Sequence, residues 1–146
     1  ERAQVLAQQH RITYDSPIEP ELIVKEIANI KQQSTQYGGV RPFGVFLMIA
    51  GIRDKKPDLY ASDITGNYFS YYANAIGESD EKIKEKLREK YKAENNIKKN
   101  VKVALDIFKE IHGKNFDLNR FEFSYIRNDE GQLKRAIRGE LNDFSK

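Results

Sequence analysis

Residues Thr35 to Ile52 read TQYGGVRPFGVFLMIAGI, and this stretch decides the fold. Its second half, Val45 to Ile52, is an almost unbroken apolar run of strand length. Such a run offers no polar face to water, which is typical of a strand that is covered on both sides. We therefore predict a strand over 45–52 that enters the middle of a sheet.

The first half of the same stretch predicts a tight turn. Gly38 and Gly39 tolerate a positive φ, and Pro42 fixes its own φ. Arg41 precedes the proline and is pushed toward an extended conformation. From the residues alone, an ordinary connection between a helix and a strand explains this pattern.

Outward from this stretch, the pattern predicts helix, helix, three strands, two helices, two strands and a helix. Antiparallel groups of strands and pairs of helices are typical of a layered α+β fold, not of a doubly wound one. The expected elements are helices at 1–11 and from Pro20, strands at 45–52, 59–61 and 68–76, helices after Ser79 and after Asn95 or Asn96, strands at 121–125 and 132–137, and a tail helix with Leu141 and Phe144.

Local signals set the expected ends of these elements. Ser79 is placed to cap the third helix, and Gly113 is placed to end the fourth. Turns are expected at 53–58 and 128–131. The second helix is expected to bury a stripe of residues at helical spacing. These residues are Ile23, Ile27 and Ile30.

Composition bounds the class of protein. The 146 residues fit one domain over 1–146, and 39% hydrophobic with 11% aromatic residues favours a globular chain. A net charge of +3 is weak support for a nucleic-acid partner. Cysteine is absent, which excludes disulfides and thiolate metal sites and fits an intracellular protein. The sequence contains no apolar run long enough to span a membrane.

The sequence offers little for catalysis. It has two histidines, His10 and His112, and neither a nucleophile elbow nor a glycine-rich phosphate loop. Its acidic residues lie along charged helix faces, so nothing beyond their number favours paired-carboxylate chemistry. The aromatic residues at 68–72 could stack on single-stranded nucleic acid, but no basic residue is interleaved with them. Aromatic packing on a strand explains them better.

The stretch YGGVRPFG at 37–44, followed by LMIAG at 47–51, closely resembles the signature of proteasome core-particle α subunits. Weaker matches follow the family's order over nearly the whole chain, and the archaeal type is the most similar. QHRITY at 9–14 resembles the end of the family's first long helix, and ANAIG at 73–77 resembles the end of a strand. Between them, Leu59 and Tyr60 followed by Asp63 and Gly66 resemble a strand and the turn after it.

This resemblance implies a partial Ntn-hydrolase-like αββα sandwich, with antiparallel sheets and outer helix layers. In the family, α subunits form seven-membered rings that gate substrate entry, dock a regulatory ATPase or activator, and support the proteolytic β rings. The resemblance implies a non-catalytic structural subunit, or a fragment of one, in the cytoplasm. It implies other α and β subunits as partners, with no catalytic residue, cofactor, metal, nucleic acid or membrane.

The resemblance also implies that the first two helices face the β ring. The candidates for the subunit interface are Tyr14, Tyr37, Gly38, Gly39, Arg41, Pro42 and Phe43. Among these, an arginine fork can pin two segments by bidentate hydrogen bonds, which a lysine could not replace.

The chain also departs from the family pattern. Ile64 and Thr65 replace the proline and serine of the family's turn, and Glu78 follows Gly77 where small residues are usual. The chain begins at Glu1 and lacks roughly the first third of the family's length, so we expect residues 1–146 to be the C-terminal two thirds of the fold. Unpaired strand edges recruit other strands. We therefore expect the chain alone to be unstable, to pair with a second copy, or to pair with the missing N-terminal piece.

Two other readings stay open. One is an Ntn-type hydrolase whose nucleophile comes from another polypeptide, and the other is a single-stranded nucleic-acid-binding module. Peptidase assays test the first, and salt-dependent retention on an oligonucleotide tests the second. The identification depends on the strand at 45–52: if this strand lies at a water-exposed rim or forms a helix, we expect the identification to fail.

Overall fold

A computed structural model describes residues 1–36 and 44–136 of the chain. It divides into two compact units, Glu1–Tyr72 and Ala73–Lys146. Each unit combines helices with antiparallel strands, which confirms the α+β class. The expectation of a single domain stays a prediction. The turn at 37–43 and the tail helix with Leu141 and Phe144 lie outside the described residues.

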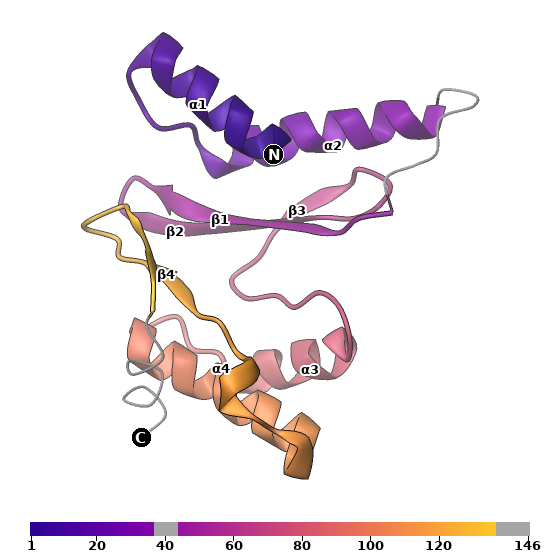
Figure 1. Ribbon diagram of the computed structural model, residues 1–146, viewed down its shortest axis with the longest axis vertical. Helices are drawn as coiled ribbons and strands as arrows, with labels where there is room; N and C mark the ends of the chain where they lie inside the picture. Colours follow the sequence, from indigo (N-terminus) through magenta and orange to yellow (C-terminus); the bar gives the residue numbers. More distant parts are fainter. Residues whose placement is uncertain (37–43, 137–146) are drawn as a thin grey trace. The chain divides into compact units, whose positions relative to one another are not determined.

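The first unit places two helices on one side of a three-stranded sheet (Figure 1). The strands are antiparallel, in the order β1-β2-β3, and α2 contacts all three. The elements are α1 (Arg2–Tyr14), α2 (Pro20–Gln36), β1 (Leu47–Arg53), β2 (Lys56–Ser62) and β3 (Tyr68–Ser70).

The second unit pairs two helices and ends in a hairpin. Its elements are α3 (Asp80–Lys90), α4 (Ile97–His112), the 3-10 turns η1 (Gly113–Asn115) and η2 (Leu118–Arg120), and the strands β4 (Ser124–Ile126) and β5 (Leu133–Arg135).

The buried stripe of α2 is not the one that the isoleucines predicted. Ile23, Ile27 and Ile30 are only half-buried. The helix has turned by about one residue, so that its buried positions are Pro20, Val24, Ala28, Lys31 and Ser34. Spacings of four and three residues connect these positions, as expected for one helix face. Small residues and one lysine therefore face the sheet, and the isoleucines flank it.

The central strand forms, but the prediction that it is covered on both sides is wrong. β1 begins at Leu47, so Val45 and Phe46 lie outside it and are 54% and 55% exposed. No residue of β1 is buried, and Met48 is 37% exposed. Alternate strand residues point to opposite faces, and α2 covers only one of them. Within the described residues, β1 pairs with β2 alone and is an edge strand, not a central one.

Two connections in the sheet also differ from expectation. The predicted turn over 53–58 is a two-residue hairpin at Asp54 and Lys55, whose φ values are 50° and 62°. Positive φ at both residues is the geometry that matches the twist of antiparallel strands. As a result β2 is longer than predicted and begins at Lys56.

β3 is shorter than predicted and ends at Ser70. Beyond it the Tyr71 amide still donates to the Leu59 carbonyl oxygen at 2.9 Å, but further on the Asn74 side-chain oxygen accepts from the amide of Ala75 at 2.8 Å. Asparagine side chains that bond neighbouring backbone compete with a strand ladder. The predicted strand over 71–76 is therefore wrong.

An apolar cluster holds the second unit together. Val101 and Leu105 of α4 are its buried centre, and their partly buried neighbours come from the start of the same helix and from the segment that follows it. These neighbours are Ile97, Phe116, Leu118, Phe121 and Phe123. Phe121 and Phe123 reach the cluster from irregular chain, so the strand predicted over 121–125 begins only at Ser124. The turn at 128–131 forms as predicted, with Gly131 at φ 64°.

The helix ends agree with the sequence in α4 and disagree in α3. Asn96 caps α4 by accepting from the Lys99 amide at 2.9 Å, and Gly113 ends it at φ 51°. Ser79 precedes α3 as predicted, but its side chain makes no capping hydrogen bond and its φ is 60°. A side-chain cap requires an extended N-cap backbone, which Asn96 has and Ser79 lacks.

Candidate subunit interface

Helix α1 presents apolar side chains outward. None of its thirteen residues is buried, and Ile12 and Tyr14 are 86% and 67% exposed. The Tyr14 ring lies 4.7 Å from the ring of His10, and His10 Nδ1 lies 3.1 Å from the Ser16 carbonyl oxygen. These contacts fix the end of the helix and leave the Tyr14 ring open. Tyr14 is thus placed as an interface residue would be, although its role stays a prediction.

The other six interface candidates lie outside the described residues. They are Tyr37, Gly38, Gly39, Arg41, Pro42 and Phe43. The described chain reaches Gln36 at the end of α2 and resumes at Gly44.

The face of the sheet that points away from α2 is also partly exposed. Gly51 marks the covered face, because an added Cβ would lie 2.6 Å from Pro20 Cγ. Met48 lies on the opposite face, and the register carries that face through Ala61 to Phe69, which is 61% exposed. An exposed apolar face next to an unpaired strand edge is typical of a surface that another polypeptide covers.

Lys31 is the residue that the sequence reasoning missed. It is 4% exposed, and its ammonium donates to the carbonyl oxygens of Val45 and Asp63, both at 2.9 Å. It also contacts Ser62, through Oγ at 3.2 Å and the carbonyl oxygen at 3.4 Å. Burial lowers the pKa of Lys31, and the nearby Asp63 carboxylate opposes that shift. The available signal was spacing, because Lys31 continues the stripe of Val24 and Ala28.

Asp63 organises the turn between β2 and β3. Its Oδ1 accepts from the amides of Thr65 and Asn67 at 2.8 and 3.0 Å and from the Thr65 hydroxyl at 2.7 Å. Burial favours the neutral acid, but the hydrogen bonds from Thr65 and Asn67 together outweigh it and lower the pKa of Asp63. Aspartate thus folds this turn without the proline and serine of the family pattern, a typical use of its short carboxylate.

Arg53 gathers carboxylates at the other end of the first unit. Its Nε lies 2.8 Å from Asp58 Oδ2, and its Nη1 lies 3.3 Å from Glu21 Oε2 and 3.9 Å from Glu19 Oε2. Asp58, before the others, raises the pKa of Arg53. Burial raises the pKa of Tyr60 beside this cluster, and the carboxylates of Glu21 and Asp58 add to that effect. The cluster is a paired cation that ties the start of α2 to the hairpin.

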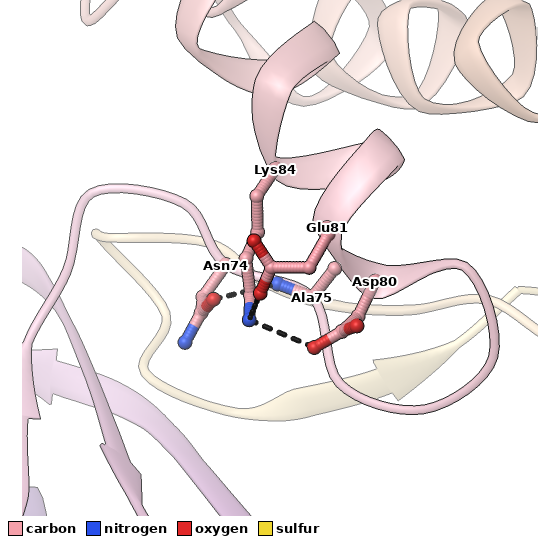
Figure 2. Close-up of polar contacts among 5 residues, drawn as sticks. All are labelled: Asn74, Ala75, Asp80, Glu81 and Lys84. Carbon is pink, nitrogen blue, oxygen red and sulfur yellow. Dashed lines mark hydrogen bonds and ion pairs between the residues drawn. The ribbon is translucent and has the colours of Figure 1, made fainter.

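A third polar group stands at the start of α3 (Figure 2). Lys84 extends toward Asp80 and Glu81, with Nζ 2.8 Å from Asp80 Oδ2 and 3.2 Å from Glu81 Oε1. These hydrogen bonds lower the pKa of Asp80 and raise that of Lys84. Pairs three and four residues apart stabilise a helix turn. The group has the geometry of a helix ion pair and not of a reaction centre.

The second unit also contains an apolar groove of about 330 Å³. It is lined by α4 and by the chain leading into β4, and its polar residues are Asn100 and Glu122. Its walls overlap the cluster around Val101 and Leu105, so it is continuous with the core of this unit.

Within residues 1–36 and 44–136, no three histidine, cysteine, aspartate or glutamate side chains are grouped so as to hold a metal ion. Over the same residues, none of the helices has the length and apolar character of a membrane span. What these residues do present is a set of exposed apolar side chains on α1 and on the open face of the sheet.

Comparison with known proteins identifies the family. Residues 1–126 match the family described as Proteasome subunit. The chain belongs to the proteasome subunit family. Relatives named Proteasome subunit alpha include that of Methanosarcina acetivorans, 35% identical over 145 residues, and that of Archaeoglobus fulgidus, 36% identical over 149 residues. The relative in Pyrococcus abyssi is 54% identical over 76 residues, which are 52% of this chain and 29% of the relative.

The alignments cover nearly all of this chain but only part of each relative. The Methanosarcina acetivorans and Archaeoglobus fulgidus alignments each include 99% of this chain and 58% of the relative. The chain thus spans less than two thirds of the length of these relatives. The resemblance seen in the sequence is confirmed, including its archaeal character. The expectation that exposure of the strand at 45–52 would overturn the identification is therefore wrong.

Proposed function

We propose that this chain is a non-catalytic structural subunit, or part of one, in the α ring of a proteasome core particle. The observation that carries the proposal is the alignment of 99% of the chain with relatives named Proteasome subunit alpha. The α+β fold and the surface of apolar side chains on α1 and the sheet are compatible with a subunit that works by holding neighbours.

The proposal extends to partners and place. The chain would assemble with other α subunits in a seven-membered ring that rests on β subunits in the cytoplasm, and the full-length protein would dock a regulatory ATPase or activator. Residues 1–146 would act as one domain, the C-terminal two thirds of the subunit fold. Tyr14 and the segment 37–43 would contribute to the interface.

Co-expression tests the assembly. The tagged chain is produced with a full-length archaeal α subunit and an archaeal β subunit, and native mass spectrometry measures its recovery in ring-sized complexes. Tyr14→Ser should lower that recovery, because it removes an exposed aromatic anchor. Tyr72→Ser changes another exposed tyrosine outside the candidates and should leave recovery unchanged. Absence of the unaltered chain from every complex would contradict the proposal.

The behaviour of the chain alone is a second test. Unpaired strand edges and an exposed apolar face should make it self-associate or unfold at low denaturant. Sedimentation velocity should therefore reveal a dimer or larger species. A well-behaved monomer that unfolds cooperatively would count against the role proposed for its open surfaces.

Activity assays separate the proposal from its rivals. The chain should not cleave peptides, either alone or mixed with a second polypeptide that carries an N-terminal threonine and is inactive by itself. Cleavage that a threonine-directed inhibitor blocks would favour the Ntn-type hydrolase. Retention on a single-stranded oligonucleotide that falls steeply with salt would favour the nucleic-acid module.

A further inference from the structure

The buried ammonium of Lys31 joins two segments that are far apart in the sequence. Val45 lies just before β1, and Asp63 lies just after β2. Both carbonyl oxygens are 2.9 Å from Lys31 Nζ. Two oxygens that share one donor nitrogen at this distance lie within about 6 Å of each other. Lys31 therefore holds the entry to β1 beside the exit from β2.

The group is satisfied by oxygen atoms. An ammonium has three N–H donors, and the three shortest contacts are to Val45, Asp63 and the Ser62 hydroxyl. Ser62 is fully buried, and its hydroxyl also donates to the Asp63 carbonyl oxygen at 3.3 Å. Buried polar groups are costly unless every donor and acceptor is paired. This network therefore favours one arrangement of the two segments over any looser one.

The β2–β3 turn packs closely against α2 next to Lys31. Gly66, in the turn that Asp63 organises, lies directly on the helix, because an added Cβ would be 2.6 Å from the Ala28 carbonyl oxygen. The turn thus sits on the backbone of α2 between Ala28 and Gln32, one helical turn around Lys31. Helix, turn and strand entry meet at the same ammonium.

We propose that Lys31 is a positioning residue that latches the entry to β1 and the β2–β3 turn onto α2, so that the two segments open and close as one cooperative unit. The latch fixes the register of Leu47 opposite Ser62, the first pair of the β1–β2 ladder. The latch thereby also fixes the positions of three exposed apolar residues in these segments, Val45, Phe46 and Ile64. This inference concerns the fold of the first unit and does not depend on the proposed function.

Hydrogen exchange of individual amides tests the latch. Lys31→Met keeps an unbranched side chain only one atom shorter and removes its donors. The amides of Asp63 and Asn67, which are bonded within the turn, and those at the start of β1 should all exchange faster by the same factor. Loss of hydrogen bonds to a charged group predicts about a tenfold increase or more. Amides near the Arg53 end of β1 should change less.

Two controls make the result specific. Lys25→Met changes an exposed lysine of the same helix and should leave all these rates unchanged. Ser62→Ala removes one acceptor of the ammonium and should reproduce the pattern at smaller amplitude. If Lys31→Met does not fold, Ser62→Ala carries the same comparison.

Three outcomes would overturn the proposal. Faster exchange in only one of the two segments would mean that Lys31 does not couple them. An equal increase at every amide of the first unit would mean that Lys31 contributes only to global stability. Unchanged exchange in both Lys31→Met and Ser62→Ala would mean that the network carries no latch.

Discussion

Different interactions stabilise the interior of each of the two units of the chain. In the first unit, α2 meets its sheet not only through apolar Val24 and Ala28 but also through a buried lysine, a buried serine and glycines at close approach. In the second, α4 meets the following segment through leucine, valine and phenylalanine side chains. Apolar burial is not directional, whereas hydrogen bonds and close backbone contacts require defined geometry. The second unit should therefore respond to lost volume, and the first to misplaced atoms.

The largest expected effect is the loss of apolar volume in the second unit. Leu105 is 4% exposed at the centre of the cluster. Leu105→Ala should lower the free energy of unfolding by about 3 kcal/mol, the usual cost of a large-to-small change in a core. Urea unfolding followed by circular dichroism measures it. Leu133→Ala, at a leucine that is 71% exposed, should change stability by less than about 0.5 kcal/mol. Equal effects at both leucines would break the comparison.

This apolar half is also where sequence reasoning worked best. The spacing of apolar residues and the flanking Asn96 and Gly113 predicted α4 nearly to the residue. The strand over 121–125 failed because alternation of Phe121 and Phe123 with polar residues is compatible with either a strand or irregular chain. Rings can reach the same cluster from both. Alternation alone therefore did not fix the backbone.

The first unit resisted prediction because its contacts are not periodic in hydrophobicity. Reading the isoleucines as the buried face of α2 hid the true stripe, which passes through Lys31. The apolar run at 45–52 predicted a strand correctly but not its exposure, which depends on what lies over it. Of the candidate interface, the resemblance named Tyr14, whose ring is exposed in the structure and whose role stays a prediction, whereas Lys31 was recognised only in the structure.

Close packing in the first unit gives the next largest effect. Gly66→Ala should cost about 2–3 kcal/mol, because its φ is 91° and the new Cβ would meet the Ala28 carbonyl oxygen at 2.6 Å. Gly77→Ala is the matched control, since φ is 109° there but nothing lies within 4 Å. It isolates the backbone cost, about 1 kcal/mol. If the two variants lose equal stability, the contact of residue 66 with α2 adds no cost, and the first unit is less sensitive to misplaced atoms than we expect.

A smaller effect compares the two helix starts of the second unit. Asn96→Ala removes the acceptor of the Lys99 amide and should cost about 1 kcal/mol. Ser79→Ala occupies the equivalent position before α3, where the hydroxyl makes no capping bond, and should be nearly neutral. Thermal unfolding of the two variants in parallel measures the difference. A loss at Ser79 as large as at Asn96 would mean that sequence position, not geometry, decides the cap.

The smallest effect is a pH dependence in the first unit. The pKa of Asp63 is lowered in the folded chain, so the unfolded chain binds more protons as the pH falls. The contribution of Asp63 is therefore fully present above its ordinary value of 3.8 and is lost as the pH drops through the folded value. Asp63→Asn should abolish this part of the acid destabilisation.

Thr65→Val removes the hydroxyl that donates to Oδ1 at 2.7 Å, so it should raise the pKa of Asp63 and remove only part of the dependence. Carboxyl-carbon NMR titration reads the pKa directly. Should Thr65→Val leave it unmoved, the hydroxyl would not contribute to the turn, and the directional bonds that set the first unit apart would be fewer than proposed.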